Sequence, residues 1–215
     1  MTAVIAPCIT AETADQYKET MERIHTFANR VHIDISDGEF APTFLVGPDQ
    51  LWWQQGWSAD IHAMVARPSE YVNQLIALKC DLIIFHAEVQ EDLLPIIKAI
   101  QASGIRAGVA LQRSTVPSQV APYIEAADHV MIFSGDLGHY GGTANLMQLE
   151  KVRLVRAIKP SVEIGWDGGV SVENAFGLAQ GGVDVLNVGG AIANSQDPAA
   201  TYQALVTEIN KHGVI

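Results

Sequence analysis

The sequence predicts an α/β protein whose parallel strands close into a (β/α)8 barrel, and three observations support this fold class. Short apolar, β-branched runs recur along the chain at a spacing of roughly 20 to 35 residues, about what a strand and a crossover helix need. Helical patterns fill the intervals between these runs. The chain has 215 residues, which is an ordinary length for one barrel of this kind.

Eight runs have the composition of strands. They are residues 4–9, 30–35, 59–65, 81–86, 106–111, 129–133, 162–166 and 184–188. Strict alternation of strands with helices gives a parallel sheet, and eight such units close it into a TIM barrel. The main alternative is an open doubly wound sheet, which usually has a Gly-rich turn after its first strand. Residues 7–10, Pro-Cys-Ile-Thr, are unlike such a turn.

Local signals predict helix boundaries and domain organisation. Thr10 is a candidate cap for the helix after the first strand, and a helix at 91–103 is expected to end at Gly104. No linker, low-complexity segment or charge block separates two parts of the sequence. We therefore expect residues 1–215 to form a single barrel domain.

Composition and charge restrict the compartment and the partners. The chain is 48% hydrophobic, but no apolar run approaches the ~20 residues of a membrane span. Its start lacks the pattern of a secretion signal, and Cys8 and Cys80 form no disulfide framework, so we expect a cytoplasmic protein. The formal net charge of -11 argues against nucleic acids and anionic membrane surfaces as partners. A small phosphorylated substrate is still compatible, because backbone amides can bind one phosphate locally.

Potential metal ligands lie within apolar strands. His32 and Asp34 are two residues apart and therefore project from the same face of one strand. His62 lies in the next strand, and Asp167 follows the seventh. These side chains would meet at the C-terminal ends of the strands, where such barrels carry their active sites. A divalent cation is an economical partner for buried carboxylates and imidazoles, although a single strand histidine is more often a hydrogen-bonded core residue.

Further candidates lie at the same ends of the strands. They are Cys8, Met64 and His86, together with the pairs Gly168-Gly169 and Gly189-Gly190 after the seventh and eighth strands. Loops after these two strands commonly bind phosphate, although a glycine pair alone is also typical of a turn. Residues 135–142 are Gly-rich and form either a substrate-covering lid or a plain surface loop. His25 and His129 have the positions of surface or helix-end residues.

Four segments resemble those of the ribulose-phosphate 3-epimerase family. They are residues 31–38 (VHIDISDG), 60–65 (DIHAMV), 85–88 (FHAE) and 166–170 (WDGGV). Their order and spacing match across essentially the whole chain, and the combination is specific. The resemblance implies a TIM barrel of the ribulose-phosphate-binding type, which agrees with the fold predicted above.

The resemblance also implies the chemistry. His32, Asp34, His62 and Asp167 would bind one divalent metal ion, with Asp34 and Asp167 as the catalytic acid/base pair. Inverting a carbon next to a carbonyl requires removing its proton on one face and returning one on the other, which two carboxylates can do. The metal would stabilise the enediolate oxygens. Two His and two Asp favour zinc, with iron, manganese or cobalt as alternatives.

Nine residues are expected to contact substrate. They are Cys8, Met64, His86, Gly141, Gly142, Gly168, Gly169, Gly189 and Gly190. The chain departs from the family's usual pattern along these walls. Cys8 stands where the family usually has Ser, Ser36 stands where it has Met, and Gly190 replaces the Ser of a Gly-Ser pair. The loop after the sixth strand is longer than the family's lid. These departures bear on which sugar is bound and leave the acid/base set intact.

The expected reaction is inversion of carbon 3 of D-ribulose 5-phosphate to give D-xylulose 5-phosphate, so the expected partner is a small phosphorylated sugar. One alternative is a related epimerase for another ketose phosphate, such as a hexulose 6-phosphate. Another is a non-catalytic sugar-phosphate-binding protein. A lyase or synthase on a related barrel would typically place Lys at the reacting centre, and the lysines here fall on expected helices or their ends. Trp52, Trp53 and Trp57 pack on the core or form a subunit contact, and we expect a homo-oligomer.

Overall fold

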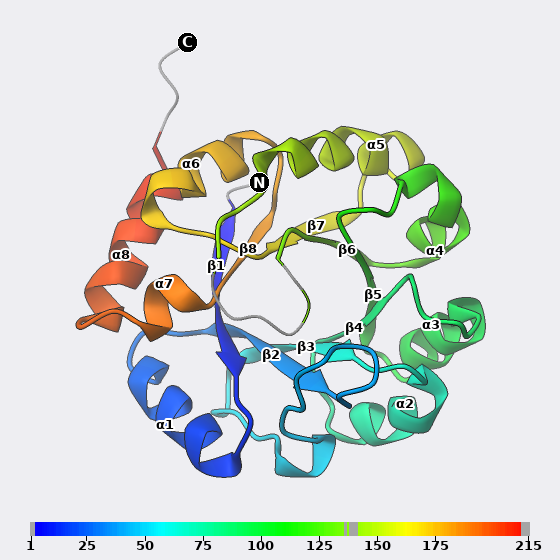
Figure 1. The fold of residues 1–215 in the computed structure, drawn as a ribbon, viewed down its shortest axis with the longest axis horizontal. Coiled ribbons are helices and arrows are strands. Elements are labelled where there is room, and N and C mark those ends of the chain that lie inside the picture. Colours follow the sequence, from blue (N-terminus) through cyan, green and yellow to red (C-terminus); the bar gives the residue numbers. More distant parts are fainter. Residues whose placement is uncertain (1–2, 136, 138–141, 212–215) are drawn as a thin grey trace.

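Eight parallel strands form one closed barrel in the computed structural model of the chain, which describes residues 3–135, 137 and 142–211 (Figure 1). They are β1 (Val4–Thr10), β2 (Arg30–Ser36), β3 (Ser58–Met64), β4 (Leu82–His86), β5 (Arg106–Leu111), β6 (His129–Phe133), β7 (Glu163–Asp167) and β8 (Val185–Val188). Each strand pairs with the next along the chain, and β8 pairs with β1. The predicted TIM barrel and its eight predicted strands are confirmed, to within one residue at each end.

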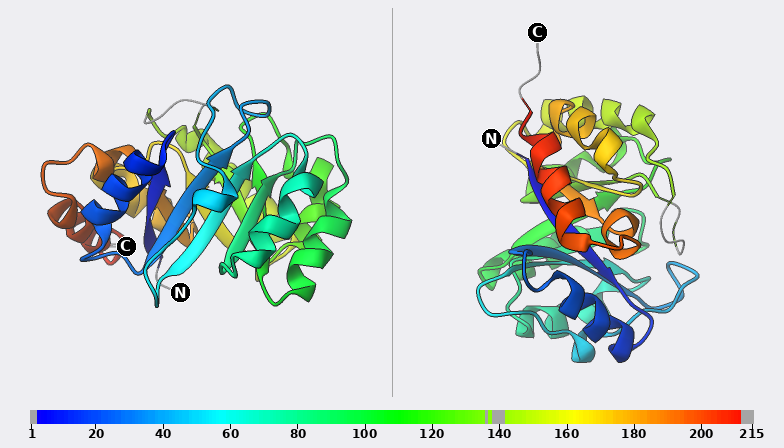
Figure 2. Two further views of the ribbon diagram at one scale, coloured as in Figure 1. Left: turned by 90° about the horizontal axis from the view of Figure 1, so that it is seen from below. Right: turned by 90° about the vertical axis from the view of Figure 1, so that its left-hand side faces the viewer.

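Helices surround the barrel on its outside (Figures 1 and 2). They are α1 (Ala14–Ile24), α2 (Pro68–Ala77), α3 (Leu93–Ala102), α4 (Ala121–Ala126), α5 (Glu150–Ile158), α6 (Val172–Gln180), α7 (Gly190–Ala193) and α8 (Pro198–Ile209), with the short 3-10 turns η1 (Pro48–Gln50), η2 (Pro117–Val120) and η3 (Leu146–Leu149). They cover the outward face of the parallel sheet, which is apolar and must be shielded from water. Within the described residues, no helix has both the length and the apolar character needed to cross a membrane.

The start of the first helix differs from the prediction. Helix α1 is capped by Thr13, whose side chain accepts a hydrogen bond from the backbone N–H of Gln16 at 3.3 Å. Thr10 is therefore not a cap, because it is still part of β1. The predicted end of α3 is confirmed, since Gly104 follows this helix with φ = +82°, a conformation that favours glycine.

Two layers of apolar side chains stabilise the barrel. Consecutive residues of a strand point to opposite faces, so Ile83 and Phe85 of β4 join the outer layer between strands and helices. Leu82 and Ile84 join the inner layer, which also contains Met131 and other side chains of β5 and β6. This inner layer fills the barrel interior next to β4, β5 and β6. Its closely packed apolar side chains support the polar groups that lie nearer the C-terminal ends of the strands.

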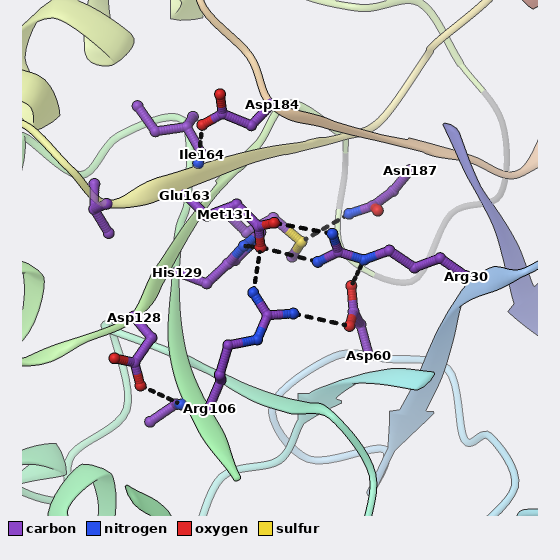
Figure 3. Close-up of polar contacts among 12 residues, drawn as sticks. Arg30, Asp60, Arg106, Asp128, His129, Met131, Glu163, Ile164, Asp184 and Asn187 are labelled. Atoms are coloured by element: carbon purple, nitrogen blue, oxygen red, sulfur yellow. Dashed lines mark hydrogen bonds and ion pairs between the residues drawn. The ribbon is translucent and has the colours of Figure 1, made fainter. Parts of the chain in front are cut away.

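The opposite end of the barrel is closed by charged side chains (Figure 3). Glu163, at the start of β7, accepts two hydrogen bonds of 2.9 Å from the Arg30 guanidinium and one of 2.9 Å from Arg106. Arg30 also donates to Asp60 at 2.7 Å. His129 Nδ1 lies 2.8 Å from Glu163 Oε2. The two arginines balance the two carboxylates, so this end is held together without a net buried charge.

We call this group of charged side chains at the closed end of the barrel the charged plug. His129 is buried in it, and its prediction as a surface or helix-end residue is wrong. It begins β6 and points into the barrel toward β7. A Cβ atom at position 165 would lie 2.5 Å from His129 Nε2, so glycine at this position makes room for the imidazole ring.

Candidate active site

A cavity of about 670 Å³ opens at the C-terminal ends of the strands. Most of the residues predicted for the site line it. They are Cys8, Asp34, His62, Met64, Gly142, Asp167, Gly168, Gly169, Gly189 and Gly190. Gly141 lies outside the described residues. The barrel thus brings segments from β1 to the loop after β8 to one mouth, as the predicted topology requires.

Four of the predicted side chains form one cluster. His32 and Asp34 of β2, His62 of β3 and Asp167 of β7 each offer one ligand atom, and these atoms all lie within 4.8 Å of one another. His62 Nδ1 is 2.8 Å from Asp34 Oδ1 and 3.9 Å from Asp167 Oδ2. His32 Nε2 is 3.3 Å from Asp34 Oδ1 and 3.9 Å from Asp167 Oδ2. Strand pairing places Asp34 beside His62, which accounts for the closest of these contacts.

The surroundings of Asp34 and Asp167 shift the pKa values of the two carboxyls in opposite directions. Burial by itself would raise the pKa of Asp34, but the adjacent imidazoles of His32 and His62 outweigh it and hold the pKa well below its ordinary value. Burial raises the pKa of Asp167, and the nearby negative charge of Asp34 adds to the effect. One carboxyl is therefore an ionised base and the other holds a proton more readily, an arrangement suited to paired acid and base roles.

The cluster also fits a divalent cation. Both ring nitrogens of His32 are buried and have no hydrogen-bond partner within the described residues. A polar atom buried in this way is costly unless another group satisfies it. Two imidazoles and two carboxylates form the nitrogen and oxygen donor set of zinc and related divalent ions. The cluster therefore has the donor types and the spacing of a metal site, and it contains buried nitrogens that still lack a partner.

His86 does not lie where substrate contact was expected. Its side chain is fully buried, and it is absent from the residues that line the cavity. It stands behind His62, with the two Nε2 atoms 2.8 Å apart, and its ring packs against Phe40 and Phe133. Burial lowers the pKa of His86 to about 4. His86 thus lies between His62 of the cluster and the outer part of the barrel.

The glycine pair after β7 has a packing role in addition to its place in the cavity. Gly168 and Gly169 have φ values of +108° and +70°. A Cβ atom on Gly168 would lie 2.2 Å from the backbone nitrogen of Gly135, and one on Gly169 would lie 2.1 Å from that of Ala144. The loop after β7 therefore packs backbone to backbone against the segment after β6. Any side chain at these two positions would separate them.

Among the cavity residues that were not predicted, Thr10 and Asn187 have side chains suited to a role in the site. Thr10 donates a 2.6 Å hydrogen bond to Asp34 Oδ2. Asn187 of β8 is buried, and its Oδ1 has no hydrogen-bond partner within the described part of the chain. Its Nδ2 lies 3.3 Å from the sulfur of Met131 (Figure 3). An amide within the otherwise apolar run 185–188 was a signal that could have identified Asn187.

No lysine lines the cavity within the described residues. Lys151 is a buried side chain of α5, and it donates hydrogen bonds to the backbone carbonyls of Gln112 and Arg113 just after β5. Its ammonium group holds this loop from outside the barrel mouth. Its position on α5 agrees with the expectation that the lysines fall on helices or their ends.

Fold and site together define the chain as a (β/α)8-barrel protein with a buried histidine and aspartate cluster at its catalytic end. The model of the ribulose-phosphate 3-epimerase family matches residues 4–193. The chain belongs to this family, and it is therefore an isomerase, a carbohydrate-phosphate 3-epimerase.

Relatives match nearly end to end. Ribulose-phosphate 3-epimerase of Schizosaccharomyces pombe is 27% identical over 216 residues, covering 97% of this chain and 95% of that protein. The cytoplasmic isoform of ribulose-phosphate 3-epimerase from Oryza sativa subsp. japonica is 30% identical over 211 residues, covering 94% and 92%. The resemblance inferred from the four sequence segments is thus confirmed.

Solved structures share the fold at much lower identity. 3-Hexulose-6-phosphate synthase from Salmonella typhimurium superposes with a TM-score of 0.70 at 16% identity, over 99% of this chain and 100% of that one. Orotidine 5'-phosphate decarboxylase from Pyrococcus horikoshii OT3 gives a TM-score of 0.70 at 14% identity, over 97% and 100%. These likenesses concern the barrel alone.

Proposed function

We propose that this protein is a metal-dependent epimerase that inverts carbon 3 of D-ribulose 5-phosphate to give D-xylulose 5-phosphate. The observation that carries the proposal is the pair Asp34 and Asp167. Both carboxyls line the same cavity, they come from strands β2 and β7, and their acidities are displaced in opposite directions. An epimerisation next to a carbonyl needs this combination of one base and one acid.

In the proposed reaction, ionised Asp34 removes the proton from carbon 3 on one face. Asp167 then delivers a proton to the same carbon on the opposite face, so one proton is taken up and one is released in each turnover. In the reverse direction the two residues exchange roles. Thr10 keeps one oxygen of Asp34 in place through its hydrogen bond, while the neighbouring histidines keep the carboxylate ionised.

His32, Asp34, His62 and Asp167 would hold the divalent ion, and the donor set favours zinc, with iron, manganese or cobalt as alternatives. Bound there, the ion would supply positive charge to stabilise the enediolate oxygens of the substrate. Cys8 contributes a neutral wall, because burial and the two aspartates raise the pKa of its thiol well above the ordinary value. Met64 adds an apolar contact on the opposite side of β2.

We place the phosphate of the substrate at the glycine loops after β7 and β8, where Gly168, Gly169, Gly189 and Gly190 line the cavity. Glycine leaves the backbone amides accessible to an anion, so these loops can bind a phosphate even though the chain as a whole is negatively charged.

Buried, unpaired Cys8 and Cys80 support a reducing compartment such as the cytoplasm. Half-exposed Trp52 supports self-association, which sedimentation would measure.

A longer ketose phosphate, such as a hexulose 6-phosphate, is the second candidate substrate. The cavity continues along α1, where it is lined by Gln16, Glu19 and Thr20. This extension could hold one further hydroxylated carbon. A kcat/KM for the hexulose phosphate that exceeds that for ribulose 5-phosphate would favour the second candidate; the reverse order supports the first.

The test of the proposed reaction is proton exchange at carbon 3 of ribulose 5-phosphate in heavy water. Metal-loaded wild type is expected to incorporate deuterium at this carbon and to produce xylulose 5-phosphate. Asp34→Asn and Asp167→Asn should each slow turnover by about 10²- to 10⁴-fold, the usual contribution of a general acid or base. The proposal fails if metal-loaded wild type neither exchanges nor epimerises this substrate.

A further inference from the structure

Three side chains form a continuous hydrogen-bonded line that leads from the cluster to the outer part of the barrel. His62 Nε2 lies 2.8 Å from His86 Nε2. His86 Nδ1 lies 3.2 Å from Glu88 Oε2. His62 and His86 are both fully buried, and atoms 2.8 Å and 3.2 Å apart leave no room for a water molecule between them. Each contact in the line therefore has to be satisfied by protons that the three residues themselves carry.

Proton counting gives the line a direction. An ionised carboxylate only accepts hydrogen bonds, and the pKa of Glu88 is lowered because contacts with His86 and Thr115 outweigh the effect of burial. His86 must then carry its proton on Nδ1, which leaves a lone pair on its Nε2. The contact between the two Nε2 atoms needs one proton, and His62 has to supply it. A bound cation would replace the proton that His62 Nδ1 otherwise shares with Asp34 at 2.8 Å, and a neutral His62 with its proton on Nε2 then presents its Nδ1 lone pair to that cation.

Glu88 is itself held so that only one oxygen is available to His86. Its Oε1 accepts a 2.8 Å hydrogen bond from the backbone N–H of Gln112 and another from the hydroxyl of Thr115. Lys151 fixes the same loop by donating to the carbonyls of Gln112 and Arg113. The carboxylate at the outer end of the line is therefore anchored by the loop after β5.

We propose that His86 and Glu88 are positioning residues that fix the tautomer of His62, so that its Nδ1 lone pair is presented to a divalent cation between the two aspartates. This inference rests on the proposed function, because it assigns a purpose to the line only if the cluster holds a metal ion. Carboxylate groups that orient a ligating histidine in this way raise metal affinity and are a general device in metal sites.

Glu88→Gln reverses the line instead of merely interrupting it. The single amide oxygen of glutamine is drawn to Gln112 and Thr115, both of which donate hydrogen bonds. The amide NH2 then faces His86 Nδ1 and donates to it. His86 must move its proton to Nε2 and donate to His62, whose own proton then lies on Nδ1, where it blocks a cation.

The first measurement is the Zn2+ affinity of purified wild type and Glu88→Gln, by competition with a chromophoric chelator. We expect about 10- to 100-fold weaker binding by the variant. Asp128→Asn is the matched control: Asp128 also accepts a hydrogen bond from a backbone amide, that of Ala107 at 3.0 Å, but lies at the closed end of the barrel (Figure 3). It should bind Zn2+ as wild type does. Wild-type affinity in Glu88→Gln overturns the proposal.

The second measurement reads the tautomer directly, by 15N NMR of the histidine rings in the metal-free proteins. His86 should carry its proton on Nδ1 in wild type and on Nε2 in Glu88→Gln. A loss of packing alone would not move this proton. An Nδ1 proton in both proteins overturns the proposal even if the metal assignment holds. Conversely, absence of Zn2+ binding by wild type contradicts the proposed metal site, while the tautomers still report on the line.

Discussion

Thr10 Oγ1 lies 2.6 Å from Asp34 Oδ2, and strand pairing sets these two residues directly beside each other on β1 and β2. The other oxygen of Asp34 faces His62, at 2.8 Å from Nδ1. The carboxylate is thus fixed from two sides, by a hydroxyl on one oxygen and an imidazole on the other. Its plane is set before any substrate arrives, which is what a proton-transferring group requires.

Thr10→Val should slow catalysis without abolishing it. The substitution preserves the shape of the side chain and removes one hydrogen bond to an ionised carboxylate, a contact worth about 1.5–3 kcal/mol. If that contact acts in the transition state, kcat falls about 10- to 100-fold while KM changes little. Steady-state kinetics on ribulose 5-phosphate measure both values.

Thr10→Ser is the matched control, because it restores the hydroxyl without the methyl group. It should retain most of the wild-type kcat. A Thr10→Val enzyme with wild-type kcat would show that Asp34 keeps its position without the hydroxyl.

Thr10 also illustrates how far sequence reasoning reached. Alternation along a strand correctly grouped His32 with Asp34, since the two residues share a face. The same rule, applied from Cys8, leads to Thr10, but a threonine before a helical pattern also has the properties of a cap. Only the length of β1, which continues to Thr10, decides between the two interpretations.

Other features depend on distances that no local pattern contains. His86 is buried behind His62 of the neighbouring strand, with the two Nε2 atoms 2.8 Å apart. Its position in the sequence alone suggested a residue at the mouth of the barrel. Arg30 and Glu163 are 133 positions apart and meet only because the barrel closes. Strand order and strand ends were predictable from periodicity. The sequence did not predict whether an inward-facing residue lies at the mouth of the barrel, in its middle or in the charged plug, because this depends on strand tilt and register.

His32→Leu should remove the stabilisation that a divalent ion confers. Both nitrogens of His32 are buried without hydrogen-bond partners within the described residues, and Nε2 is the one that faces Asp34 and Asp167, so a bound cation is the natural partner of Nε2. At a Zn2+ concentration 100 times the Kd, binding adds about 2.7 kcal/mol to the free energy of unfolding. For a chain of this size that is a rise in Tm of roughly 5–10 °C. Thermal unfolding of each protein with and without Zn2+ measures the shift.

Wild type should show this rise, and His32→Leu should show little or none relative to its own metal-free Tm. An equal rise in both proteins would remove His32 from the ligand set.

Asn187→Leu should affect substrate binding and stability in opposite directions. Asn187 lines the cavity, and its Oδ1 is buried without a partner in the described structure, so we expect it to accept a hydrogen bond from a substrate hydroxyl. Losing that bond should raise KM by about 2- to 10-fold. The free variant should be more stable by about 1 kcal/mol, because it no longer buries an unpaired oxygen. A more stable variant with an unchanged KM would restrict Asn187 to a packing role.

Glu163→Gln should destabilise the barrel in a pH-dependent way. Glu163 bonds Arg30, Arg106 and His129 in the charged plug (Figure 3), so the variant leaves two arginines without their shared carboxylate. Breaking a largely buried ion pair from one side costs about 3–5 kcal/mol. Urea unfolding at pH 7 measures this loss.

The sign of the pH dependence follows from the direction of the pKa shift. Burial would raise the pKa of Glu163, but its bonds to Arg30 and His129 outweigh that effect and lower the pKa well below the ordinary value of 4.5. In the unfolded chain Glu163 therefore takes up a proton near pH 4.5, while the folded protein still keeps it ionised. Its stabilisation is complete above this pH and is lost progressively as the pH falls toward the folded value.

The difference in unfolding free energy between wild type and Glu163→Gln should consequently be smaller at pH 3.5 than at pH 7. Glu22→Gln is the control, because Glu22 pairs with Lys18 on an exposed face of α1 and should contribute little at either pH. An unchanged difference between the two pH values would mean that the plug is held by packing and neutral hydrogen bonds. In that case the charge of Glu163 would add nothing to the closure of the barrel.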